Sequence, residues 1–149
     1  MQINILCAVR DRRMAQELDM EIGDGERCTF RIVTSGTDAI KASRSFTPDI
    51  LIVDAVLPEL DGLGVIDRMR EMLGDRMPRV IGGSMNHFAD EGFWRRGAKS
   101  MIGVPWVREE IRSAVLLQME SIQTSVDFDE AQEACRRAMA LLSGMGIPR

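Results

Sequence analysis

Short apolar runs alternate five times along the chain with segments whose apolar residues recur at helical spacing. The first run covers residues 3–9, and in the segment 12–22 that follows, Met14, Leu18 and Ile22 share one helical face. The remaining expected strands are 28–33, 50–53, 79–84 and 99–104, and the remaining expected helices are 37–46, 62–73, 89–96 and 108–122. This order predicts an α/β fold, a doubly wound five-stranded parallel sheet of flavodoxin-like (βα)5 type.

The most apolar expected strand ends in an acidic residue. Residues 50–53 read Ile-Leu-Ile-Val, which is typical of a parallel strand covered on both faces, and Asp54 follows directly. In doubly wound sheets, reactive groups and ligands gather at the carboxyl ends of the strands, so Asp54 is the first candidate for chemistry. The alternative is a structural Asp54 that accepts backbone hydrogen bonds in the turn.

The last part of the chain has a different pattern. The polar stretch TSVDFD after Gln123 indicates a break, with Asp127 or Asp129 capping a final helix that ends near Gly144. We therefore expect one domain over residues 1–122, and a linker with a C-terminal helix over 123–149.

Composition narrows the classes of function. The net charge of -4 weighs against nucleic-acid binding by this segment. Its apolar runs are too short for a membrane span and no signal peptide is recognisable, so we expect a cytoplasmic protein. Cys7, Cys28 and Cys135 are expected to be unpaired thiols, and His87, the only histidine, to lie on the surface. One histidine supplies neither a metal cluster nor a hydrolytic triad, so we expect no enzyme.

The segment PDILIVDAVLPELDG, residues 48–62, resembles the third strand and following loop of CheY-like receiver domains of response regulators. Further matches are SGTDAI before the second helix, Gly97-Ala98 before the fifth strand, and Pro105 after it. The resemblance covers roughly residues 1–120 and implies that Asp54 is the phosphoacceptor. In that family a divalent metal, bound by this aspartate and by acids after the first strand, and a lysine after the fifth strand offset phosphoryl charge.

This sequence departs from the family pattern at most of those positions. The end of the first strand carries no acid, and valine precedes Pro105 in place of lysine. Glycine stands at the usual hydroxyl position of the fourth strand, and methionine replaces the aromatic residue of the fifth strand. The degenerate positions are Cys7, Ala8, Val9, Gly83, Met101 and Val104. The candidate helpers that remain are Asp11, which could instead serve the start of the first helix, and Ser84.

Two functions are compatible with this pattern. The first is an atypical receiver, or pseudo-receiver, that acts by dimerisation or by binding a histidine kinase, a phosphotransferase or a regulatory protein, with little phosphorylation and no cofactor. The alternative is a working phosphoacceptor at Asp54, with Mg²⁺, in a phosphorelay that controls transcription. The family surface that mediates dimerisation would here include Phe88, Phe93, Trp94, Met101 and Trp106.

The tail carries a second resemblance. EACRRAMALLSGMGIPR is similar to the opening helix of the DNA-binding effector domain in sporulation-type response regulators. This similarity implies that the chain is the regulatory part of a longer protein.

Overall fold

The computed structural model describes residues 2–23, 25–85 and 87–144, without the side chains of His87, Phe88 and Gly144. The expected surface position of His87 and the expected interface role of Phe88 therefore lie outside the described residues, as does the end of the tail. The chain forms two compact units, residues 1–118 and 119–149.

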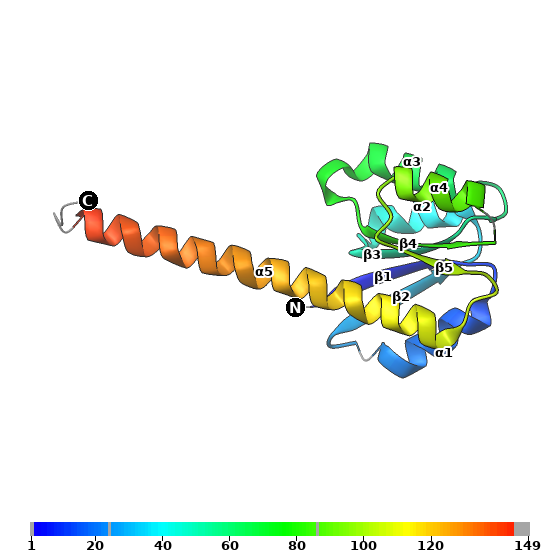
Figure 1. Cartoon of the computed structure of the whole chain (residues 1–149), viewed down its shortest axis with the longest axis horizontal. Helices are drawn as coiled ribbons and strands as arrows, with labels where there is room; N and C mark the ends of the chain where they lie inside the picture. The colour runs from blue at the N-terminus through cyan, green and yellow to red at the C-terminus, as the bar shows by residue number, and fades with distance from the viewer. Residues whose placement is uncertain (1, 24, 86, 145–149) are drawn as a thin grey trace. The chain divides into compact units, whose positions relative to one another are not determined.

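Five parallel strands form one sheet in the order β2-β1-β3-β4-β5 (Figure 1). The strands are β1 (Ile3–Ala8), β2 (Cys28–Val33), β3 (Ile50–Asp54), β4 (Arg79–Ser84) and β5 (Ser100–Gly103). The helices are α1 (Arg12–Ile22), α2 (Gly36–Ser45), α3 (Gly62–Leu73), α4 (His87–Arg95) and α5 (Arg108–Gly144), with a short 3-10 turn, η1 (Gly74–Arg76). Helices α2, α3 and α4 cover one face of the sheet, and α1 and the start of α5 cover the other. The predicted doubly wound fold is confirmed.

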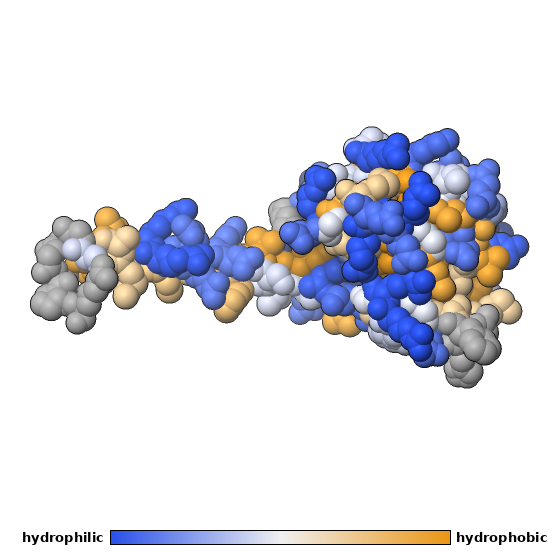
Figure 2. Space-filling model, turned by 90° about the horizontal axis from the view of Figure 1, so that it is seen from above, coloured by the Kyte–Doolittle hydropathy of each residue, from blue (hydrophilic) through white to orange (hydrophobic). Residues whose placement is uncertain are grey.

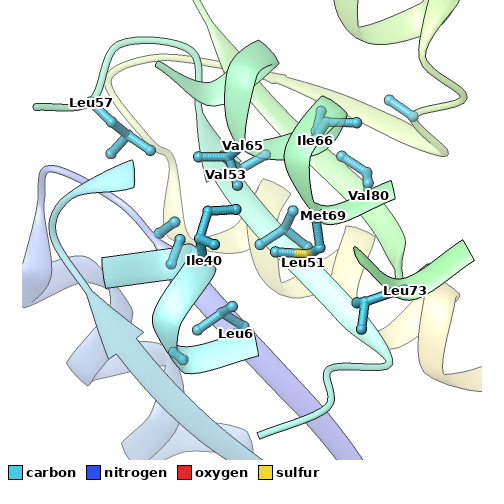
Figure 3. Close-up of a cluster of buried hydrophobic side chains, with 14 of the residues drawn as sticks. Leu6, Ile40, Leu51, Val53, Leu57, Val65, Ile66, Met69, Leu73 and Val80 are labelled. Atoms are coloured by element: carbon cyan, nitrogen blue, oxygen red, sulfur yellow. The ribbon is translucent and has the colours of Figure 1, made fainter. Parts of the chain in front are cut away.

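The core on one face of the sheet is built from the strand residues that the apolar pattern singles out. Leu51 and Val53 of β3, Leu6 of β1, and Ile66 and Met69 of α3 belong to one buried cluster, and none of the five is exposed (Figure 3). Every residue of β3 is buried, including Asp54 at its end. Burial of this apolar surface, at roughly 25 cal/mol per Å², holds the carboxyl ends of the strands in place.

The loop that follows β3 depends on a glycine at the start of α3. A Cβ on Gly62 would overlap the carbonyl oxygen of Asp54, so only glycine allows the helix to begin this close to the strand. The Gly62 N–H donates to the carbonyl of Ala55 at 2.9 Å. Asp61 caps the helix by accepting the N–H of Gly64. This turn sets the position of the loop beside Asp54.

The predicted linker after Gln123 is wrong, because α5 is one uninterrupted helix of 37 residues. Its polar segment forms hydrogen bonds that fit a helix, from Ser125 Oγ to the carbonyl of Ser121 and from Gln123 to Asp127. Residues 108–143 contain neither glycine nor proline, so nothing in the backbone interrupts the helix. The boundary between the two units falls within α5, after Gln118.

Candidate functional site

A pocket of about 570 Å³ opens at the carboxyl ends of the strands, where the topology places functional groups. It is lined by Arg10, Asp11, Asp54, Ala55, Val56, Gly83, Ser84, Met85, Val104, Pro105 and Trp106. The structure therefore brings together the predicted phosphoacceptor, both candidate helpers and two of the degenerate positions. The remaining degenerate positions and the predicted interface residues Phe93 and Trp94 do not line it.

Asp54 is only 4% exposed, and its two carboxylate oxygens have different surroundings. Oδ2 accepts the backbone N–H of Arg10 at 2.6 Å, which ties the loop after β1 to the end of β3. Oδ1 is buried and makes no hydrogen bond with the described residues. Burial raises the pKa of Asp54, and this effect outweighs the lowering by the Arg10 N–H, by the Trp106 indole and by the Arg10 charge.

Trp106 takes up the space beside Asp54 that a side chain on β4 would otherwise fill. Gly83 pairs with Asp54 in the sheet register, and a Cβ on Gly83 would overlap Cζ2 of the Trp106 ring. The Trp106 Nε1 atom is buried and makes no hydrogen bond of normal geometry with the described residues, yet it lies near enough to lower the Asp54 pKa. The indole therefore lies in the same pocket as Asp54, on the side of Gly83.

The sequence interpretation assigned Trp106 only to an interface and missed its place in the pocket. Two features of the sequence are consistent with that place. Trp106 comes two residues after Val104, which stands in place of the family lysine. The adjacent strand has two glycines before its last residue, Ser84, and these leave room for a large ring. The Val104–Pro105 bond is cis, and the Val104 N–H donates to the carbonyl of Ser84 at 3.2 Å.

The acidic residues that line the pocket are Asp54 and Asp11, and a magnesium ion is usually held by one or two carboxylates together with water or phosphate oxygens. Asp11 accepts the N–H of Met14 at 3.2 Å and caps α1, as the sequence suggested it could. Across the described ranges, no three Asp, Glu, His or Cys side chains are placed to hold a metal. Arg10 is the only basic residue among those that line the pocket, and it is exposed.

The degenerate positions in β1 belong to the core. Cys7 and Ala8 are fully buried, and burial, with a smaller contribution from the negative charge of Asp19, raises the pKa of the Cys7 thiol far above its usual range. Cys7 is therefore a neutral core residue. Cys7, Cys28 and Cys135 form no disulfide, as expected.

The predicted interface is only partly exposed. Phe93 is fully buried and belongs to the hydrophobic core, so its assignment to an interface is wrong. The side chain of Phe93 faces the sheet, where its ring lies against Gly82 of β4. Met101 is partly buried beside the same glycine, whereas Trp94 on α4 is 53% exposed.

No family model matches the chain. It is 26% identical to the response regulator MprA of Mycobacterium ulcerans over 146 residues, 96% of this chain and 60% of the relative. It is 31% identical to the Regulator of RpoS of Escherichia coli K12 over 62 residues, 42% of this chain and 18% of the relative. The chain thus spans less than two thirds of these relatives.

Solved structures give the same fold. The signal receiver domain of a protein described as a Luxo repressor, from Vibrio parahaemolyticus, matches with a TM-score of 0.71 at 20% identity, over 84% of this chain and 95% of that one. A Francisella response regulator receiver domain matches with a TM-score of 0.67 at 19% identity, over 80% of this chain and 98% of that one. The chain has the receiver fold of two-component response regulators.

Proposed function

We propose that this chain is an atypical receiver domain that regulates by binding other proteins, without magnesium-dependent phosphorylation of Asp54. The environment of Asp54 carries the proposal. One of its oxygens is held by the Arg10 N–H at 2.6 Å, and the Trp106 ring lies over the neighbouring Gly83. The second acid among the described lining residues, Asp11, caps α1, and no lysine is found among them.

Phosphoryl transfer depends on positioning and on charge neutralisation, and this pocket supplies little of either. Val104 offers no charge-assisted contact to a phosphoryl oxygen, a contact worth about 1.5 to 3 kcal/mol. The indole of Trp106 and the 4% exposure of Asp54 restrict the approach of a phosphodonor. We therefore infer that phosphorylation of Asp54 is very slow and that the chain has no enzymatic role.

The partner is a protein: a histidine kinase, a phosphotransferase or a regulatory protein. The names of the relatives support this class, since one is a response regulator and another is a regulator of RpoS. Trp94 on α4, which is 53% exposed, is an aromatic residue of the unit 1–118 that can anchor such a contact. Because the chain covers 60% of MprA, we further propose that residues 123–149 lead into an effector domain.

Labelling with radioactive acetyl phosphate and magnesium tests the proposal. The unmodified chain should incorporate no more label than Asp54→Asn over an hour. The variant Arg10→Asp/Val104→Lys restores an acid and a cation to the pocket, and it should gain label that is lost again when Asp54→Asn is added. Labelling of the unmodified chain within minutes, abolished by Asp54→Asn, would overturn the proposal.

A working phosphoacceptor is the second candidate, favoured by the position of Asp54 at the end of β3 in a pocket of about 570 Å³ that Ser84 also lines. The chain has two tryptophans, so Trp94→Phe leaves Trp106 as the only reporter. A saturable fluorescence change of this variant with beryllofluoride and magnesium supports this second function. An unchanged spectrum supports the atypical receiver.

A further inference from the structure

The second half of α5 carries an apolar face that nothing in the described chain covers. All side chains from 127 to 143 are exposed. Phe128, Ala131, Cys135, Ala138 and Leu142 follow one another at alternating spacings of three and four residues, the a and d pattern of a coiled coil. Because a helix gains most of its stability in water from packing, this face indicates a helical partner.

The charges of this segment lie away from that face, which we call the 128–142 face. Within residues 128–142 its flanking positions are uncharged: Gln132, Ala134, Met139 and Leu141. The charged residues take the outer positions, and there Arg136 and Arg137 both pair with Glu133, at 3.2 and 3.5 Å. Figure 2 shows hydrophilic and hydrophobic residues on different parts of this helix.

We propose that the 128–142 face binds the same face of a second copy of the chain, with the two helices antiparallel. Charge supports this orientation. Asp129 and Glu130 lie on the N-terminal side of the segment and make no ion pair with any described residue, and Arg136 and Arg137 follow. An antiparallel pair centred on residue 133 sets Asp129 level with Arg137 of the second copy, and Glu130 level with Arg136, at the outer positions of the two helices. A parallel pair would set like charges side by side.

The sizes of the side chains support the same register. In the antiparallel pair Phe128 faces Ala138, Ala131 faces Cys135, and Leu142 faces Thr124 of the second copy. Each layer then combines a larger with a smaller side chain, which fills the seam evenly. A parallel pair would stack Phe128 on itself and leave two layers of paired alanines, with gaps between them. The contact spans residues 124–142, roughly 27 Å at 1.5 Å per residue.

Sedimentation equilibrium of the full chain tests whether the face self-associates. Dimerisation that increases with protein concentration is expected. Ala138→Glu places a charge in the seam and should leave a monomer, whereas Ala140→Glu, the matched control on the charged side, should dimerise as the unmodified chain does. Circular dichroism should show equal helix content in both variants. A monomer at every concentration, or a dimer that survives Ala138→Glu, overturns the proposal.

Charge reversal tests the orientation. Asp129→Arg/Glu130→Arg makes both halves of the segment basic and should raise the dimer Kd about tenfold at low salt. Adding Arg136→Glu/Arg137→Glu restores opposite charges across the antiparallel pair and should return the Kd to near its original value. An unchanged Kd for the first variant indicates parallel helices and contradicts the antiparallel pair. The proposal does not depend on Asp54, so Asp54→Asn should dimerise normally whatever labelling at Asp54 shows.

Discussion

At the scale of single residues, the character of the pocket depends on the groups that surround the carboxylate of Asp54. Asp54 stands where a receiver domain carries its phosphoacceptor, but its immediate contacts are the Arg10 N–H and the Trp106 indole. Both contacts are compatible with a buried acid that joins strands together. The effect of these contacts can be measured as a change in the free energy of unfolding of the chain alone.

Asp54→Asn should raise the free energy of unfolding at pH 7 by about 1 kcal/mol, since the buried charge is removed and one amide oxygen still accepts the Arg10 N–H. The pKa of Asp54 is raised in the folded protein, so the folded state holds its proton more tightly than the unfolded chain does. Stability is therefore lost as pH rises from the unfolded value of about 3.9 through the folded pKa.

Urea unfolding across this pH range measures the effect. The advantage of Asp54→Asn should grow as pH rises from acidic values and level off above the folded pKa. A difference between the two proteins that stays constant with pH would contradict a burial-raised pKa.

Gly83→Ala should lower the free energy of unfolding by about 1 to 3 kcal/mol, because the added methyl overlaps the Trp106 ring. In a Trp106→Ala background the same change should cost much less, and the double-mutant cycle gives the coupling. Gly103→Ala is the matched control, since no atom lies within 4 Å of a Cβ built there. Equal costs of Gly83→Ala in both backgrounds would place the Trp106 ring elsewhere.

At the scale of elements, α5 shows where local composition and structure diverge. The stretch TSVDFD contains residues that favour turns, and the sequence therefore predicts a break there. In the structure these side chains make hydrogen bonds along the helix, such as that from Ser125 Oγ to the Ser121 carbonyl. Serine, threonine and aspartate disfavour helices because their side chains can form hydrogen bonds with nearby backbone groups. In α5 the hydrogen bonds of these side chains are compatible with the helix.

Ser125→Pro tests the continuity of α5. Proline removes a helical N–H and clashes with the preceding turn, at a local cost of about 3 kcal/mol. Hydrogen exchange should become faster on both sides of residue 125, and far-UV circular dichroism should lose helical signal. Ser125→Ala, the control, should change neither. Unaltered exchange in Ser125→Pro would mean that the segment is a linker after all.

At the scale of the whole molecule, residues 1–118 hold the sheet and its core as one compact unit. The described helices of the chain do not combine the length and apolar character needed to cross a membrane. Because residues 1–118 form a compact unit, a chain shortened to residues 1–122 should unfold in a single cooperative transition, with a Tm within about 3 °C of the full chain. Calorimetry measures this, and a broad or absent transition would show that later residues are needed for the fold.

Most of the fold was predictable because it depends on local periodicity. Alternating strand and helix patterns predict a parallel sheet, and the apolar run before Asp54 predicts a central strand that ends at the functional edge. The same patterns could not separate Phe93, which is buried, from Trp94, which is 53% exposed, since both are aromatic and adjacent in the sequence. Exposure of a helical residue depends on the direction in which the helix packs.

The sequence by itself determined the order of the elements, the place of Asp54 at the carboxyl edge, and the absence of the usual acids and lysine at their expected positions. Only the tertiary structure decided what stands beside Asp54. The Trp106 ring meets Gly83, and the Arg10 N–H meets the carboxylate, across segments that lie far apart in the chain. Such contacts leave no periodic signal, because they arise when the ends of separate strands converge.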